Sequence, residues 1–294
     1  MERITLSRAG KGPLRATLSM IKFQHTLFAL PFAFTGAALA AGGTPTARQI
    51  VWIAGAMVGA RSAAMVWNRI ADLRFDRLNP RTASRPLVTG ELGLPFAFGF
   101  LAASIALFYA SAAMLNRLSL VLATPALALI LLYSHAKRFT WTTHLFLGAS
   151  LGLEPLGAWV AVRGSVDAAP LLLGAAVACW VAGFDIIYSC QDVEFDRREG
   201  LHSIPGRFGI AAALRISSWL HVATIGLLAA LPLLLPLGAA YLSGMLAMAA
   251  LLWYEHRLVR PDDLSRVNEA FFTVNGCVSF LFLATTALDL LLSA

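Results

Sequence analysis

The chain has 294 residues, of which 58% are hydrophobic and only 13% charged, and its mean hydropathy is +0.71. Soluble domains carry roughly 25% charged residues, so this composition excludes an ordinary soluble domain. The formal net charge is +7, but the basic residues are spaced between apolar runs and form no patch, which argues against nucleic-acid binding. The three cysteines, Cys179, Cys190 and Cys277, show neither metal-ligand spacing nor a disulfide framework.

Nine apolar segments follow one another along the chain, each close to the roughly 20 residues that cross a bilayer. Backbone polar groups in lipid must be satisfied within the segment, so each segment is predicted to be helical. The segments cover about residues 24–41, 50–67, 94–115, 118–134, 143–162, 168–188, 210–231, 235–253 and 270–292. We therefore predict an all-α, polytopic membrane protein with nine transmembrane helices in one bundle.

The basic residues concentrate in alternate loops. All of them except Arg48, Arg61, Arg117 and Arg163 lie in the N-terminal stretch or after the second, fourth, sixth and eighth segments. Cytoplasmic loops of membrane proteins carry the excess of Lys and Arg. This bias predicts a cytoplasmic N-terminus for a multi-pass protein of the cell inner (plasma) membrane.

Carboxylates recur with helical spacing at the ends of the second and sixth segments. The first set is Asn68, Asp72 and Asp76, and the second is Asp185, Tyr188, Asp192 and Asp196. On a continuous helix each set lines one face. Residues 72–77 and 192–197 also share the pattern D-x-x-F-D-R, and the four segments between them return both sets to the same predicted side, the cytoplasmic one.

Two facing sets of carboxylates repel each other and therefore require a cation. Mg²⁺ prefers hard oxygen ligands and is typically held by one or two carboxylates together with substrate phosphates. The two sets thus predict a magnesium–diphosphate site. In the alternative interpretation the acids are interfacial and pair only with neighbouring arginines. That interpretation requires neither the shared register nor the repetition, and acids at membrane depth generally mark function.

A diphosphate also requires fixed positive charge where negative charge develops. Basic residues on the same predicted side can supply it, namely Arg85, Lys137, Arg138 and Arg207. Each arginine taken alone is explained equally well as a topology determinant. Lys137 has a stronger case, because Tyr133 lies four residues before it on the same helix face.

Four further positions carry charge or a ring nitrogen in or near predicted spans. Lys22 and His25, at the start of the first segment, are predicted to bind an acidic group of a substrate. An equally good interpretation is that Lys22 only extends its ammonium to the membrane interface. Arg61 and Glu154 lie within spans, and their rarity there suggests an ion pair inside the bundle, with residues lining a water-filled cavity as the alternative.

The first acidic set resembles the first motif of the UbiA superfamily of intramembrane aromatic prenyltransferases. That motif is N-D-x-x-D-x-x-x-D, which Asn68, Asp72 and Asp76 match, whereas Arg69 stands at its second position. The similarity extends over nearly the whole chain. It implies one UbiA-like transmembrane prenyltransferase domain over residues 1–294, with the first Asp motif at 68–76 and the second at 185–196.

The rest of the family pattern is matched on the later segments. Asp192 and Asp196 supply the D-x-x-x-D core of the second motif, and Tyr133 and Lys137 match the Tyr-x-x-x-Lys of the fourth span. The phrases KFQHTLFALPF and GLHSIP resemble a prokaryotic subgroup described as 4-hydroxybenzoate polyprenyltransferase-like. Some members of this subgroup serve menaquinone synthesis, and residues 22–26 replace the Arg-x-Asp-Lys-Pro stretch of better-known 4-hydroxybenzoate enzymes.

The resemblance implies Mg²⁺-dependent transfer of a polyprenyl group from polyprenyl diphosphate to a small aromatic acceptor, with 4-hydroxybenzoate favoured, in ubiquinone or other quinone biosynthesis. The implied metal ligands are Asn68, Asp72, Asp76, Asp192 and Asp196. The implied diphosphate-binding residues are Asn68, Arg85, Lys137, Arg138 and Tyr133. The implied catalytic residues are Asp72, Asp192, Lys137, Asp185 and Tyr188, and the acceptor-binding residues are Lys22 and His25.

Several alternatives stay open. A menaquinone enzyme that prenylates a naphthoate or a futalosine-type precursor would carry the same Asp motifs. An ion-coupled transporter would also hold intramembrane acids, although transporters place them near the bilayer midplane in broken helices. The Asp-Gly and Ala-Arg pairs of CDP-alcohol phosphotransferases are missing from both motifs. The sequence predicts neither the prenyl chain length nor the oligomeric state.

Overall fold

The computed structural model describes residues 12–293, apart from the side chains of residue 13 and of residues 23–29. Within this range the regular structure is helical, and the one strand-like pairing is an isolated bridge between Arg260 and Asp263. The long helices are α2 (Phe23–Ala41), α3 (Ala47–Ala71), α6 (Leu94–Leu115), α7 (Arg117–Ala136), α8 (Thr143–Arg163), α9 (Ala168–Ser189), α12 (Ile210–Ala230), α13 (Ala239–Leu258) and α15 (Asn275–Leu292). The predicted all-α class is confirmed.

Each predicted apolar segment coincides with one of these long helices. Seven stretches of the described chain are long and apolar enough to cross a membrane. The other two segments correspond to α2, whose described apolar stretch is Leu30–Ala41, and to α13, which carries polar residues from Tyr254 to Arg257 near its end. The protein is therefore a multi-pass membrane protein, while nine crossings and a cytoplasmic N-terminus stay predictions.

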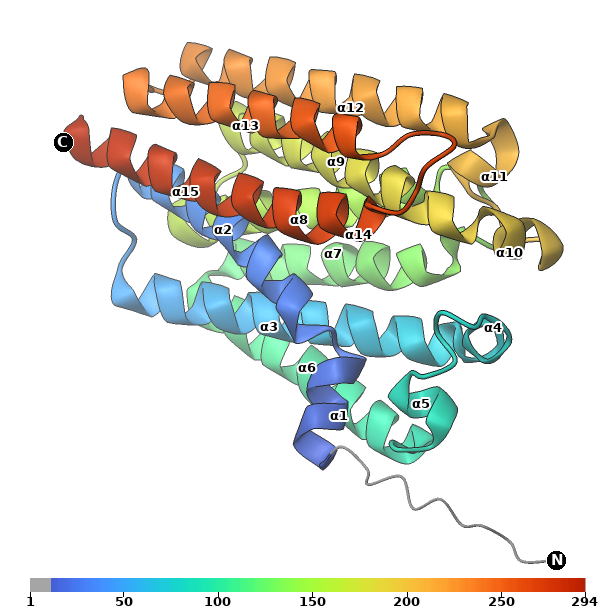
Figure 1. The fold of residues 1–294 in the computed structure, drawn as a ribbon. Coiled ribbons are helices and arrows are strands. Elements are labelled where there is room, and N and C mark those ends of the chain that lie inside the picture. Colours follow the sequence, from blue (N-terminus) through green and yellow to red (C-terminus); the bar gives the residue numbers. More distant parts are fainter. Residues whose placement is uncertain (1–11, 294) are drawn as a thin grey trace, which may run out of the picture.

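Short helices gather at one end of the bundle, where α4, α5, α10 and α11 lie close together (Figure 1). The short elements are α1 (Pro13–Met20), α4 (Leu73–Leu78), α5 (Pro86–Thr89), a 3₁₀ turn (Cys190–Asp192), α10 (Val193–Arg198), α11 (Ile204–Phe208), a 3₁₀ turn (Leu231–Leu233), α14 (Val267–Glu269) and a π-helical turn (Ala270–Val274). Since α4 contains the end of the first acidic motif and α10 the end of the second, both motifs reach the same end.

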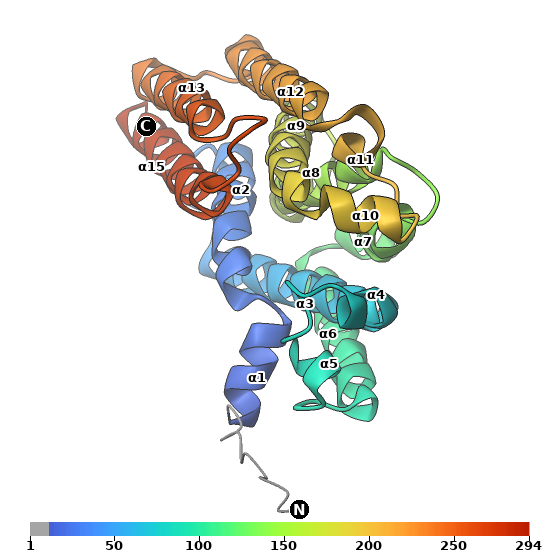
Figure 2. The same cartoon turned by 45° about the vertical axis from the view of Figure 1, so that its right-hand side comes forward.

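Four clusters of buried apolar residues hold the described part of the bundle together, and the two largest contain the helices of the two motifs. One lies among α1, α3 and α6 and includes Ala63 and Leu101. The larger one lies among α2, α9, α13 and α15 and includes Trp180, Met248 and Phe282. Figure 2 shows α3 and α6 apart from α12, α13 and α15. The two motifs therefore belong to different packing units, and the site forms where these units meet.

Helices α8 and α9 approach each other backbone to backbone. A Cβ atom on Gly152 of α8 would lie 2.5 Å from the carbonyl oxygen of Gly174 on α9, and Gly148 is similarly close to Ala178. Small residues permit this approach, which is a common packing device in membranes. As a result the first turn of α8, with His144, lies directly against Asp185 of α9.

Candidate active site

Both acidic motifs interrupt their helices at the same relative position. Helix α3 ends at Ala71, and Asp72 has φ −92° and ψ 7° before α4 begins. In the second motif a 3₁₀ turn follows α9, and Asp192 has φ −103° and ψ 5° before α10 begins. These dihedrals fall in the sparsely allowed bridge region, where many active-site residues lie. The sequence repeat is therefore also a repeat of backbone geometry. Each helix is interrupted beside its aspartate, while the side chains of both sets line the same cavity.

A polar cavity of about 250 Å³ lies between the two motifs. Its walls include every predicted site residue whose side chain is described, namely Lys22, Asn68, Asp72, Asp76, Arg85, Tyr133, Lys137, Arg138, Asp185, Tyr188, Asp192 and Asp196. The side chain of His25 lies outside the described residues. Arg207 does not line this cavity and instead stacks on Trp141.

Four carboxylates of the motifs each face one basic side chain. The pairs are Asp76 with Arg85 at 2.5 Å, Asp192 with Arg81 at 2.5 Å, Asp72 with Arg138 at 3.3 Å and Asp196 with Lys137 at 3.5 Å. Asp76 and Asp196 are buried, with 6% and 1% of their surface exposed. Buried carboxylates require partners, and here each partner comes from a loop or helix end beside the cavity.

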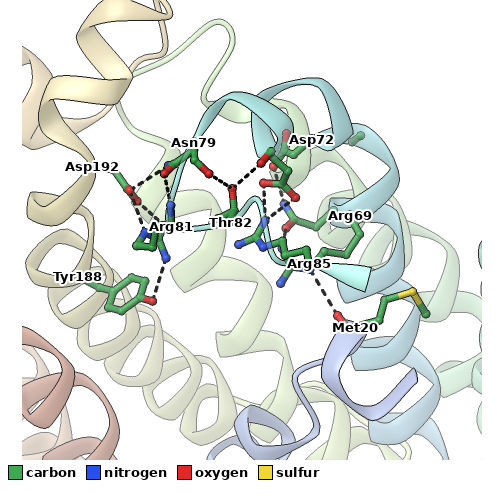
Figure 3. A network of polar contacts seen from close by, with 12 residues as sticks. Met20, Arg69, Asp72, Asn79, Arg81, Thr82, Arg85, Tyr188 and Asp192 are labelled. Carbon is green, nitrogen blue, oxygen red and sulfur yellow. Dashed lines mark hydrogen bonds and ion pairs between the residues drawn. The ribbon is translucent and has the colours of Figure 1, made fainter. Parts of the chain in front are cut away.

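Arg81 joins the two motifs across the cavity (Figure 3). Its Nε and Nη2 donate to the two carboxylate oxygens of Asp192 at 3.0 and 2.5 Å, and its Nη1 donates to the Tyr188 hydroxyl at 3.1 Å. Asn79 Nδ2 donates to Asp192 at 3.3 Å. A bidentate guanidinium fixes the orientation of a carboxylate as well as balancing its charge. The loop after the first motif therefore orients the second.

The charge of Lys137 is stabilised by carboxylates of both motifs. Burial alone would lower the pKa of Lys137, but Asp196, Asp192, Asp185 and Asp72 together raise it above its usual value. The ammonium is thus held in its charged form inside the site. Burial also raises the pKa of Asp72, followed by repulsion from Asp76, while Arg138 and Lys137 oppose the rise.

Lys22 occupies an unusual position at the junction of α1 and α2. It is the one non-glycine residue of the described chain with a positive φ, at φ 51° and ψ 52°. Burial lowers its pKa, and the positive charges of Arg69, Arg85 and Arg81 lower it further. A lysine held among arginines in a strained conformation is well placed to bind an anion.

A second, apolar cavity of about 430 Å³ adjoins the polar one among α3, α6, α7 and α8. The two cavities share the wall residues Arg61, Met65, Tyr133, Leu147, Leu151 and Glu154. Arg61 and Glu154 thus lie where polar and apolar space meet, and the charge of Arg61 acts on Glu154. An ion pair between them stays a prediction.

Four residues of the site are not predicted by the sequence patterns, namely Arg69, Asn79, Arg81 and His144. Arg69 donates to Asn68 Oδ1 at 3.0 Å and to the carbonyl of Met20 at 3.4 Å. The segment Asn79-Pro80-Arg81 directly follows the first motif, which was a usable signal. His144 had none, because its partner lies 41 residues away.

A polytopic helical bundle with paired acidic motifs, and with a polar cavity beside an apolar one, defines an integral-membrane enzyme for an amphiphilic substrate. Comparison with known proteins specifies the class. The UbiA prenyltransferase family profile matches residues 29–283. The chain belongs to the UbiA prenyltransferase family and is an aromatic prenyltransferase.

The most informative relatives agree with this assignment. A 4-hydroxybenzoate octaprenyltransferase of Pseudomonas aeruginosa (strain UCBPP-PA14) is 31% identical over 249 residues, which cover 85% of this chain and 84% of that protein. One of Aromatoleum aromaticum is 34% identical and covers 84% and 83%. Among solved structures, a UbiA homolog from Aeropyrum pernix K1 aligns with a TM-score of 0.83 and 41% identity over 90% of this chain and 98% of that one.

A more distant structure shares the fold. The UbiA homolog from Archaeoglobus fulgidus, solved with DMAPP and Mg²⁺ bound, has a TM-score of 0.73 and 22% identity over 93% of this chain and 98% of that one. The membrane-embedded UbiA architecture is therefore common to all of these proteins.

Proposed function

We propose that this enzyme transfers a polyprenyl group from polyprenyl diphosphate to 4-hydroxybenzoate in quinone biosynthesis, from the cytoplasmic side of the inner membrane. The observation that carries the proposal is the polar cavity, which lies beside an apolar cavity. In it, four carboxylates each pair with one basic side chain. The polar cavity suits a charged diphosphate, and the apolar one suits a prenyl tail. The names of the relatives support the acceptor.

The donor set fits magnesium. Asp72, Asp76, Asp192 and Asp196, with the amide of Asn68, offer only hard oxygen ligands. Among the described residues no three His, Cys, Asp or Glu side chains form a ready metal cage. That pattern agrees with a cation whose remaining ligands are phosphate oxygens and water. When bound, magnesium would neutralise charge on the diphosphate leaving group.

The basic side chains of the site can exchange partners. Arg85, Arg138, Lys137 and Arg81 each pair with a motif carboxylate, and each is close enough to the cavity to turn toward a phosphate oxygen. As the bond between the prenyl carbon and oxygen breaks, the leaving diphosphate gains negative charge, which fixed cations stabilise. Tyr188 and Tyr133 present aromatic rings that can stabilise the allylic cation, and the surrounding bundle excludes water.

A panel of acceptors tests the proposal. We expect the purified enzyme in lipid vesicles, given Mg²⁺ and geranyl diphosphate, to prenylate 4-hydroxybenzoate at least about tenfold faster than a dihydroxynaphthoate or a futalosine-type compound, a discrimination of the size a few lost polar contacts produce. Chelation with EDTA should abolish turnover. If the enzyme preferred the naphthoate, the proposed acceptor would be wrong and the enzyme would belong to menaquinone biosynthesis. If EDTA left turnover unchanged, the proposed role of magnesium would be wrong.

Lys22 gives the acceptor site a predictable pH dependence. Because burial and neighbouring arginines lower its pKa, its ammonium contributes to carboxylate binding at low pH and loses that contribution as pH rises through the lowered pKa. We expect KM for 4-hydroxybenzoate to rise with pH in the wild type. Lys22→Arg should flatten that rise, since a guanidinium stays charged throughout. If only KM for the prenyl diphosphate changed, Lys22 would belong to the diphosphate site instead.

A further inference from the structure

Asp185 lies deeper in the cavity than the metal-binding motif. It lies on α9, seven residues before Asp192, which ends the 3₁₀ turn after that helix. Seven residues correspond to roughly 10 Å along a helix axis, so Asp185 lies further into the bundle than the four ion pairs. Its side chain lines the polar cavity with 17% exposed. This is the depth at which the prenyl carbon and the acceptor ring must meet if the diphosphate lies among the motif carboxylates.

His144 holds Asp185 in one orientation. The imidazole of His144 is fully buried in the first turn of α8, and its Nδ1 is 2.6 Å from Oδ2 of Asp185. The backbone N–H of Ile204 donates to the other ring nitrogen, Nε2, at 3.3 Å. A nitrogen that accepts a hydrogen bond carries no proton, so the proton is on Nδ1 and is donated to Asp185. Oδ1 of Asp185 has no hydrogen-bond partner among the described residues.

The segment that fixes His144 also contacts the diphosphate side of the site. Besides the bond from Ile204, the N–H of His202 donates to the carbonyl of Lys137 at 2.7 Å, and the N–H of Leu201 donates to the carbonyl of Asp196 at 2.8 Å. Residues 201–204 therefore connect the end of the cavity with Lys137 and Asp196 to the deeper end with His144 and Asp185.

We propose that His144 is a positioning residue that presents Asp185 as the base for the acceptor, an inference that rests on the proposed function. When the prenyl C–O bond breaks, the allylic cation forms a C–C bond with the acceptor ring, and that ring carbon must then lose its hydrogen. The proton passes to Oδ1 of Asp185 while Oδ2 keeps its bond from His144, and it leaves the site with the released diphosphate. No oxidant or further reactant is required.

The test is a kinetic isotope effect on an acceptor deuterated at the carbons that are alkylated. In the wild type we expect breakage of the C–O bond to limit the rate, so that deuterium has no effect. In His144→Phe we expect transfer to fall about 100-fold, the usual contribution of a positioned base, and a normal primary isotope effect to appear. His144→Asn keeps a donor near the position of Nδ1 and should recover most of the rate. His135→Asn changes a histidine that meets Trp67 edge-on outside the cavity, and it should match the wild type.

Two further variants separate positioning from a structural role. Ile204→Pro removes the N–H donor at the first residue of α11, where proline is tolerated, and the preceding Ser203 is already extended. It should show a smaller loss together with an isotope effect. In a double variant with Asp185→Asn, His144→Phe should cause no further loss, because both act through one group. This comparison also covers the case in which His144→Phe folds poorly.

Two results would overturn the inference. One is a His144→Phe enzyme that is slower but shows no isotope effect, and whose loss of rate adds to the loss caused by Asp185→Asn. The other is an acceptor that loses a carboxyl group in place of a ring hydrogen, because such a reaction needs no base at this position. A wild type that alkylates a different ring with loss of hydrogen would correct the proposed acceptor only, and the isotope test with that acceptor would still decide the role of His144.

Discussion

Asp192→Asn is expected to lower prenyl transfer by three orders of magnitude or more. The amide keeps the shape of the side chain but removes the charge that faces Arg81 and Asn79 at the centre of the site. Loss of one preorganised electrostatic partner typically costs about 100- to 1,000-fold in rate, and a metal ligand that also orients an arginine belongs at the upper end. Steady-state transfer of geranyl diphosphate over a range of Mg²⁺ concentrations measures the effect.

The control for this variant is Glu194→Gln in α10, two residues after Asp192. Glu194 is exposed and does not line the cavity, so its substitution should leave the rate and the melting temperature unchanged. Asp192→Asn should stay folded, with its melting temperature in detergent lowered only by the loss of the ion pair with Arg81. If Asp192→Asn reached the wild-type rate at any Mg²⁺ concentration, the second motif would not be part of the active site.

Lys137→Met is expected to lower kcat about 100-fold with a smaller change in KM. Its ammonium is kept charged by carboxylates of both motifs, so it offers fixed positive charge where the leaving diphosphate develops negative charge. An interaction that strengthens only in the transition state appears in kcat. Single-turnover release of diphosphate measures this step directly.

Two control variants help to interpret the result for Lys137→Met. Lys137→Arg keeps the charge and should recover part of kcat, whereas Arg198→Ala removes an exposed charge at the same end of the bundle and should have no effect. If Lys137→Met changed KM alone, Lys137 would contribute to ground-state binding and not to leaving-group departure.

Much of the fold could be predicted from hydropathy alone. The predicted segment 94–115 has the same bounds as α6, and 143–162 differs from α8 by one residue. A bilayer requires long helices, so their existence follows directly from composition. The boundaries near the motifs could not be predicted, because helical spacing continues through Asp72 and Asp192 while the backbone does not.

The site was predictable where residues repeat in sequence and unpredictable where they meet only in space. The two motifs and the Tyr133–Lys137 pair were visible as spacings. The contact of Arg81 with Asp192 spans 111 residues, and that of His144 with Asp185 spans 41 and depends on the glycine-mediated approach of α8 to α9. Long-range contacts of this kind arise from the packing of helices, which periodicity does not encode.

The bridge from Arg81 to Asp192 and Tyr188 has a thermodynamic consequence. It joins the loop beyond α3, a helix of one apolar cluster, to α9, a helix of the larger cluster, and to the turn after α9. A substrate that binds the Arg81 guanidinium weakens this bridge between the two clusters. The same substrate also makes new contacts to residues of both. Substrate affinity and the cohesion of the bundle are therefore linked quantities, and selection acting on either one constrains the other.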